Sequence, residues 1–113
     1  MTVNLIDIIG SSSAVSPRKG LVAYDFVAPK IFSGESIDVS FEGITDLTSA
    51  FCNAFIGKLY MTLDTDVVKT KLRLSGIAAE HVWMRKIENA ILLGSNENAR
   101  NFHHENLEKA IHS

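Results

Sequence analysis

The sequence predicts one α/β domain with a small, mostly parallel sheet and helices packed mainly on one face of that sheet. Two runs of residues, 36–42 and 70–76, alternate apolar with polar positions, which is the period of a strand with one buried face. Other segments repeat apolar residues every three or four positions, as amphipathic helices do. The resulting order, strand–helix–strand–helix–strand–helix, suits parallel strands joined by right-handed crossovers.

The composition is that of a globular protein without a strong charge bias. With 113 residues, the chain has room for one hydrophobic core. A net charge of −2 and the lack of a Lys/Arg run give no general attraction to nucleic acid. No apolar stretch approaches the roughly 20 residues of a membrane span, and the first residues do not resemble a signal peptide. We therefore expect a cytoplasmic protein that binds neither nucleic acid nor membranes.

The first element is a short apolar run at residues 3–9, interrupted only by Asn4 and Asp7. Because the run is apolar on both sides, we interpret it as a strand that is covered from both faces. A polar, serine-rich loop at 10–16 separates this strand from the next element.

A helix is expected to begin at Ser16 and Pro17, because serine caps helices and proline lacks an N–H that would be unpaired there. Pro29 is expected to kink or shorten this helix, and Gly34 to close it. The predicted core stripe comprises Leu21, Tyr24, Ala28, Ile31 and Phe32, with Val22 and Phe26 beside it.

The second strand, 36–42, is expected to end at Gly43, since a residue free to adopt positive φ suits a sharp turn. Either Asp46 or Thr48 is expected to cap the helix that follows. The apolar face of this helix comprises Phe51, Phe55 and Leu59, widened by Ala54 and Ile56. A separate stripe of small or polar residues, open to close approach by another molecule, comprises Ser49, Asn53 and Gly57.

Residues 63–67 are expected to form a turn before the third strand, 70–76. The third strand carries Leu72 and Leu74 on one side and basic residues on the other. If it neighbours the second strand, its Arg73 shares a surface with acidic residues of that strand. One face of the sheet is then partly exposed to solvent.

The last predicted helix spans 78–93 and ends at Gly94, a residue that commonly terminates helices. Its core stripe comprises Trp83, Ile87, Ala90 and Ile91. We assign 1–94 to the body of the domain and 95–113 to a helical tail of the same domain. This tail is expected either to pack weakly on the body or to dock on another chain.

Several strings resemble a known family. Phe41, Gly43 and Ile44 give the pattern F-x-G-I, and residues 48–60 read TSAFCNAFIGKLY. These strings look like the strand, turn and helix of small bacterial STAS-like domains, which are relatives of sulfate-transporter and anti-sigma-factor-antagonist domains. Residues 87–90 look like the I-x-N-A of the family's next helix, and 16–20 are similar to the start of its first. The sequence departs from the pattern at Ser40, where many members have Asp, and at Ala54, where some have Glu.

The resemblance implies a regulatory module that binds a protein partner, an ATPase or kinase of the anti-sigma-factor type. The expected contact residues are Thr45, Asp46, Thr48, Ser49, Asn53 and Gly57. In anti-sigma-factor antagonists a Ser or Thr at this helix start is phosphorylated, so the resemblance implies Ser49 as first phosphoacceptor and Thr48 as second. The D-S-S-G run of the antagonists is replaced here by T-S-A-F, and helix capping alone also accounts for these hydroxyls.

A second hypothesis places an anion, such as a nucleotide, at the loop and helix start 11–19. The residues expected to hold it are Ser16, Arg18 and Lys19, because a helix N-terminus with nearby cations attracts negative charge. The resemblance permits this, since nucleotide binding has been associated with STAS domains. No G-x-G-x-x-G or Walker spacing is present, and a plain polar loop is the competing interpretation.

No arrangement of residues predicts an enzyme, and we expect neither a cofactor nor a metal. Cys52 lies inside an apolar helix face, and Ser49 has no identifiable His or Asp partner. The acidic pair Asp64 and Asp66 lacks a third carboxylate, and no spacing of the four histidines converges on a metal. A third hypothesis is self-association into a homo-oligomer through apolar residues of the tail, which are Phe102, Leu107 and Ile111.

Overall fold

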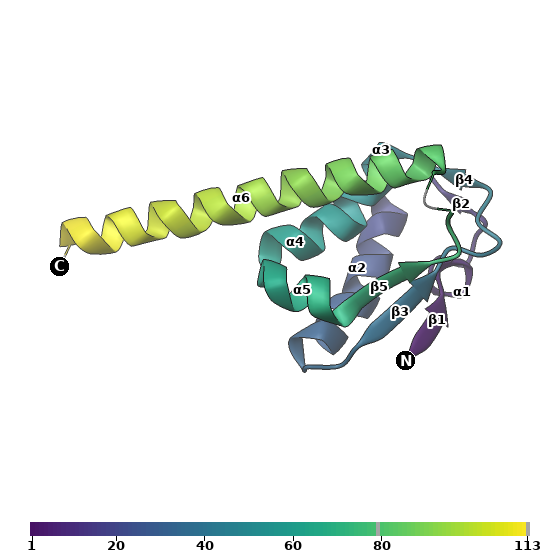
Figure 1. Cartoon of the computed structure of the whole chain (residues 1–113), viewed down its shortest axis with the longest axis horizontal. Coiled ribbons are helices and arrows are strands. Elements are labelled where there is room, and N and C mark those ends of the chain that lie inside the picture. The colour runs from purple at the N-terminus through teal and green to yellow at the C-terminus, as the bar shows by residue number, and fades with distance from the viewer. Residues whose placement is uncertain (79, 113) are drawn as a thin grey trace.

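The computed structural model describes residues 1–78 and 80–112, with the side chains of the last helix described as far as Ala99. Figure 1 shows a small sheet at one end of a layer of helices, with the final helix lying across that layer. The elements are, in order, β1 (Thr2–Asn4), α1 (Leu5–Ile9), β2 (Ser13–Ala14), α2 (Pro17–Phe32), β3 (Ile37–Ser40), β4 (Asp46–Leu47), α3 (Ser49–Cys52), the π-helical turn η1 (Asn53–Gly57), α4 (Lys58–Thr62), α5 (Thr65–Lys71), β5 (Leu72–Ser75) and α6 (Val82–His112).

The described strands form a three-stranded sheet in the order β1–β3–β5 and a separate two-stranded pair, β2–β4. All of these pairings are parallel. The predicted α/β class and the parallel sheet are therefore confirmed. The central strand β3 makes the sheet continuous, because it bonds to β1 on one side and to β5 on the other.

The sheet has one apolar and one polar face, as the alternating runs predict. Val39 is fully buried in β3 and pairs with Val3 on one side and Leu74 on the other, so these residues share the apolar face. One position earlier, Asp38 pairs with Arg73 on the opposite face, where Ser75 also donates a hydrogen bond to Asp38. Because β3 and β5 are neighbours, the expected meeting of acidic and basic side chains on one surface is confirmed.

The core is built on the continuous helical segment α3–η1–α4, here called the central helix (49–62). Its predicted apolar face is confirmed, since Phe51, Phe55 and Leu59 are each fully buried. The Phe51 and Phe55 rings meet edge to face, with centroids 5.9 Å apart. Thr48 caps the start of the helix by accepting a hydrogen bond from the Phe51 N–H, as predicted.

Two neighbouring helices approach the central helix at glycines. At Gly20 of α2, an added Cβ would lie 2.7 Å from the Ala54 Cβ and 2.7 Å from the Phe51 carbonyl oxygen. At Gly94 of α6, an added Cβ would overlap the carbonyl group of Gly57. The central helix is therefore held between α2 and α6, and backbones at both crossings are closer than side chains allow.

Two short helices replace elements that were predicted to be extended or irregular. Residues 5–9, expected to complete a strand, form α1, which ends at Gly10 in the left-handed conformation with φ 68°. Residues 65–71 form α5 rather than a turn, because the Asp64 carboxylate accepts bonds from the backbone N–H groups of Asp66 and Val67. A short apolar run does not separate strand from helix by period alone, which accounts for the first error. The second error arose because Asp64 acts as a helix cap rather than as a turn residue.

The predicted core stripe of α2 is only partly right. Ala28 and Ile31 are buried, but Leu21 is exposed and Phe32 has 83% of its surface in solvent. Val22 and Phe26, expected beside the core, are exposed as well. Small residues take the inner positions because α2 packs closely on the central helix; the buried residues of α2 are Gly20, Ala23, Val27, Ala28 and Ile31.

The ends of α2 agree with the sequence. Ser16 accepts a hydrogen bond from the Lys19 N–H and Pro17 follows it. The helix continues for less than one turn beyond Pro29 and ends at Phe32, and Gly34 follows with φ 95°. Pro29 thus shortens the helix rather than interrupting its middle.

The predicted stop at Gly94 is wrong, because α6 runs without a break from Val82 to His112. Glycine at this position provides close packing against Gly57 instead of a helix end. Past the expected boundary, the Asn98 amide donates to the carbonyl oxygens of Tyr60 and Leu63, at distances of 2.9 and 2.7 Å. These bonds satisfy carbonyls at the end of α4, so the first turns after Gly94 pack on the domain.

The apolar tail residues on which self-association was predicted lie outside the described side chains. They are Phe102, Leu107 and Ile111. The predicted helical character of the tail agrees with the bounds of α6.

We predict that Gly94→Ala destabilises the protein. In an exposed helix the same change stabilises by about 0.5–1 kcal/mol, because alanine has the higher helix propensity. Here the new methyl group overlaps the Gly57 carbonyl, and overpacking of this kind costs about 1–3 kcal/mol. Urea unfolding measures the difference.

Asn96→Ala is the control, because Asn96 lies on the exposed side of the same helix. It is expected to change the free energy of unfolding by less than about 0.5 kcal/mol. An unchanged or higher stability of Gly94→Ala would contradict the close crossing.

Candidate functional site

The two loops singled out by the sequence meet in space. Strand β2, in the serine-rich loop, pairs with β4, which lies just before the central helix. The register sets Ser13 against Asp46 and Ala14 against Leu47. Ala14 and Leu47 are buried, so this two-residue pair is anchored in the core. The serine-rich loop and residues 45–49 of the candidate contact site are therefore parts of one surface.

Side-chain hydroxyls and one carboxylate join the two loops. The Asp46 carboxylate accepts hydrogen bonds from the hydroxyls of Ser13 and Thr45, each at 3.1 Å. The backbone N–H of Thr45 also donates to the Ser12 carbonyl oxygen, at 2.8 Å. We call this surface the hydroxyl rim and define it by Ser12, Ser13, Thr45, Asp46, Thr48 and Ser49.

Thr48 and Ser49 occupy different environments on the rim. The Thr48 hydroxyl donates to the Val15 carbonyl oxygen at 2.7 Å and accepts from the Phe51 N–H at 3.2 Å. Both hydrogen-bonding functions of Thr48 are thus used to hold the loop and cap the helix. The Ser49 side chain is exposed, and no hydrogen bond among the described residues involves its hydroxyl. Of the two predicted phosphoacceptors, Ser49 is the accessible one.

Lys86 of α6 brings a positive charge to the same helix start. Its ammonium donates to the Leu47 carbonyl oxygen at 2.8 Å, one residue before the Thr48 cap. The charge of the same ammonium lowers the pKa of the buried Cys52 thiol. Burial has the larger, opposite effect and raises the pKa of the Cys52 thiol to about 11. Sequence reasoning missed Lys86, because nothing in the spacing of α6 indicates contact with residue 47.

The residues proposed for anion binding lie next to the rim but do not converge. The Ser16 hydroxyl is occupied by the Lys19 N–H, which it caps at 3.2 Å. Arg18 is exposed, and Lys19 is half-buried. The helix start itself is present as predicted.

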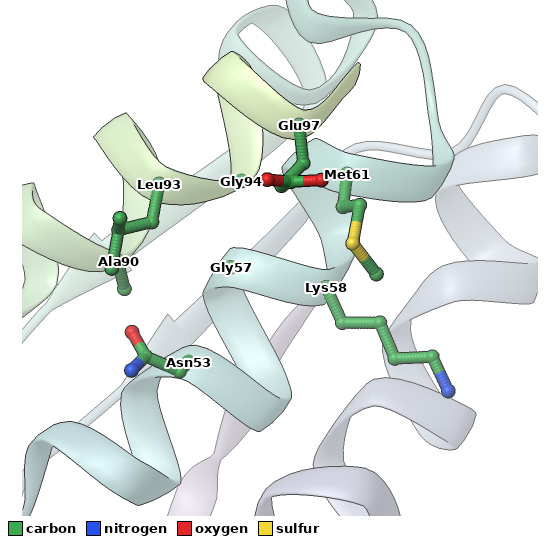
Figure 2. A pocket seen from close by; sticks show the side chains of 8 residues that line it. All are labelled: Asn53, Gly57, Lys58, Met61, Ala90, Leu93, Gly94 and Glu97. Atoms are coloured by element: carbon green, nitrogen blue, oxygen red, sulfur yellow. The ribbon is translucent and has the colours of Figure 1, made fainter. Parts of the chain in front are cut away.

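The small-residue stripe of the central helix divides into an exposed and a covered part. Ser49 and Asn53 are exposed as predicted, but Gly57 is buried, because α6 crosses directly over it. The molecule that approaches this stripe closely is thus the protein's own helix. Beside the crossing, α4 and α6 form a groove of about 210 Å³. Figure 2 shows the residues that line it, which are Asn53, Gly57, Lys58, Met61, Ala90, Leu93, Gly94 and Glu97.

Of the remaining polar residues that were weighed for chemistry, Asp64 and His81 have structural partners. Asp64 caps α5, as described above, and its carboxylate is used by backbone N–H groups. Within the described part of the chain, no three His, Cys, Asp or Glu side chains are grouped so as to hold a metal ion. His81 contacts Trp83 there, while the side chains of the other histidines lie outside the described residues. None of the helices described is both long and apolar enough to cross a membrane.

The parallel sheet, the central helix and the rim at its start define a small α/β domain. Residues 24–81, about half of the chain, match the family described as the STAS-like domain of unknown function (DUF4325). The chain belongs to this family, and the resemblance read from residues 41–60 is confirmed. The matched region includes β3, β4, the central helix and β5. No curated protein and no solved structure matches the chain.

We predict that Thr48→Ala lowers the free energy of unfolding by about 1–2 kcal/mol, since it removes a helix cap and the bond to Val15. Ser49→Ala, at the next residue, is the matched control and should change stability by less than about 0.5 kcal/mol. Thr48→Ser should retain most of the stability. Equal effects of the two alanine substitutions in urea unfolding would refute the distinction between these hydroxyls.

We also predict that Cys52 does not react with Ellman's reagent at pH 8 in the native protein, because its thiol is buried and its pKa is about 11. The reaction should become complete in denaturant. The unfolded thiol ionises near 9.0 and the folded thiol near 11, so unfolding releases protons in this window. Stability should therefore fall as pH rises from 9 to 11 in the native protein but not, through this group, in Cys52→Ala.

Proposed function

We propose that this protein is a non-enzymatic regulatory module that binds a protein partner through the hydroxyl rim. The observation that carries the proposal is the union of the two loops into one surface, fixed by the β2–β4 pair and the hydrogen bonds to Asp46. A surface of short side chains on buried anchors loses little conformational entropy when a partner binds. The partner suggested by the family resemblance is an ATPase or kinase of the anti-sigma-factor type.

Phosphorylation of Ser49 is the proposed switch. Ser49 is exposed, whereas the Thr48 hydroxyl is already bound on both sides. A phosphate at Ser49 adds nearly two negative charges to the start of the central helix. Asp46 precedes that helix start, and the Lys86 ammonium of α6 donates to the Leu47 carbonyl oxygen there. The charge of the rim would change from that of one carboxylate, Asp46, to strongly acidic, so a partner that fits the unmodified rim would not bind the phosphorylated one.

The nucleotide or anion hypothesis remains a second proposal with weaker support. The Ser16 hydroxyl would have to release the Lys19 N–H before it could bind a ligand. Calorimetry with a panel of nucleotides tests it, and Arg18→Ala should abolish any binding that is seen. Protein binding is preferred because the rim needs no such rearrangement.

Affinity capture from the native host, followed by titration of the purified partner, tests the main proposal. We expect the unmodified protein to bind and Ser49→Glu to weaken binding by about tenfold or more, because it places a fixed charge on the rim. Ser36→Glu is the matched control, since Ser36 is exposed before β3, at the opposite end of that strand from the rim. Ser36→Glu should bind as the unmodified protein does.

Intact-mass spectrometry of protein from the native host tests the switch separately. A mass increase of one phosphate that disappears in Ser49→Ala supports Ser49 as the acceptor. A partner that binds Ser49→Glu as tightly as the unmodified chain, or the absence of any partner, would count against the rim.

A further inference from the structure

The strand β1 lies at one edge of the three-stranded sheet, so only one of its two sides is paired. Figure 1 shows β1 as the outermost strand on its side of the sheet. The Asp38 N–H of β3 donates to the Met1 carbonyl oxygen at 2.8 Å, which fixes the phase of the pairing. Alternate residues of a parallel strand bond to the same neighbour. The backbone groups of Thr2 and Asn4 are therefore directed away from β3.

These outward backbone groups have the pattern that one more strand requires. Asn4 is the N-cap of α1, so its carbonyl is directed into that helix while its N–H is not. Within residues 1–78 and 80–112, no group of the chain accepts the N–H of Thr2 or of Asn4 or donates to the Thr2 carbonyl oxygen. Both residues are exposed. Donors and an acceptor at alternate positions of a free edge are a template for an extended chain.

A pocket of about 300 Å³ adjoins this free edge. Val3, on the apolar face of the sheet, is only half-buried although the neighbouring Val39 is fully buried, because no strand lies beyond β1. Phe26 of α2, 36% exposed, forms another apolar wall. The residues that line the pocket come from β1, α1 and α2 and are Thr2, Val3, Asn4, Asp7, Ile8 and Phe26.

We infer that this edge binds an extended segment of a partner protein, which pairs with β1 as an additional strand and places a large apolar side chain against Phe26. The side chains of a strand alternate between its two faces, so every second residue of the added segment faces the helices. The pocket lies where such a residue needs apolar contacts. The free edge and the pocket thus select the same occupant from two independent observations, one of the backbone and one of the side chains.

Charge adds to the description of the segment. Among the described residues that line the pocket, Asp7 alone is charged, and it is exposed. Lys30 reaches the Phe26 ring, with its ammonium 4.6 Å from the centroid, but it is not a lining residue. A basic residue beside the apolar one therefore complements the pocket.

A second copy of this chain fits the edge less well. Its own β1 spans only Thr2–Asn4 and offers a single apolar side chain, that of Val3, to the face that the helices cover. Pairing of β1 with β1 would also set two Asp7 carboxylates of like charge in one contact. A partner segment with a larger apolar residue and a basic neighbour has neither disadvantage.

An NMR titration of the full chain with synthetic peptides tests the inference. The probes are peptides of about seven residues in which threonine alternates with valine, leucine, isoleucine or phenylalanine, each with one lysine. At least one probe should shift the amide resonances of Asn4 and Ile8. The same peptide with its apolar residues replaced by serine is the matched control and should bind at least about tenfold more weakly, because serine does not fill the pocket.

Two substitutions in the protein separate the edge from the pocket. Thr2→Pro removes the outward N–H but none of the bonds to β3, and proline is tolerated at such edge positions. Phe26→Ala removes a wall of the pocket. Each should weaken peptide binding by at least about tenfold. Phe32→Ala is the matched control, since Phe32 is an 83% exposed phenylalanine of the same helix outside this pocket, and it should bind as the unmodified protein does. Circular dichroism verifies that each variant is folded.

Probes that shift no resonance of β1 at millimolar concentration would overturn the inference. Binding that is equally tight in Thr2→Pro and in the unmodified chain, or that Phe32→Ala weakens as much as Phe26→Ala, would overturn it too. A dimer in light scattering that Thr2→Pro converts to single chains would assign the edge to a second copy instead. The pocket shares no residue with the hydroxyl rim, so the outcome is independent of partner binding at Ser49.

Discussion

The structure depends on how closely two helices approach the central helix. Gly20 and Gly94 each place backbone where a side chain would otherwise stand, and both crossings fall at or beside the π-helical turn Asn53–Gly57. Because the three helices are so close, their atoms make many dispersion contacts with one another. Phe51 and Phe55 of the central helix are fully buried. Dense packing of this kind tolerates little change in volume, so the orientation of the central helix is fixed by its neighbours.

A fixed central helix has a direct consequence for the surface at its start. Thr48 caps the helix and also holds Val15, so the serine-rich loop is attached to a rigid element. Asp46 adds the bonds to Ser13 and Thr45, and Lys86 reaches the same corner from α6. Three elements that are distant in sequence thus determine the shape of the rim. Positioning of this kind is what a recognition surface requires if it is to bind without paying for loop ordering.

Much of the fold could be predicted because its signals are local. The alternation around Val39 and the fourfold spacing of Phe51 and Phe55 each record one buried face, and both are confirmed. The errors have a different origin. Gly94 has the identity of a helix stop, but its role is set by Gly57, which is far away in the sequence. The inner side of α2 carries small residues such as Gly20 and Ala23, because α2 also packs closely on a segment that is distant in the sequence. The prediction assumed that the largest apolar residues of α2 face the core, and it therefore chose the wrong side of the helix.

The candidate site was predicted in pieces rather than as a whole. Thr48 and Ser49 were identified from the helix start and the family resemblance, and the serine-rich loop from its composition. Their union depends on a pair of two-residue strands, which are too short to leave a periodic pattern. Lys86 and Asn98 act through backbone carbonyls, and any residue can supply a carbonyl, so no sequence signal marks those contacts.

Native-state hydrogen exchange of the central helix tests the central claim most directly. If α2 and α6 clamp this helix as described, the amide protons of Phe55, Ile56 and Leu59 should exchange only through global unfolding. Their protection should then equal the full free energy of unfolding measured with urea. Exchange of these amides by local opening, several kcal/mol below that value, would show that the crossings at Gly20 and Gly94 do not hold the helix.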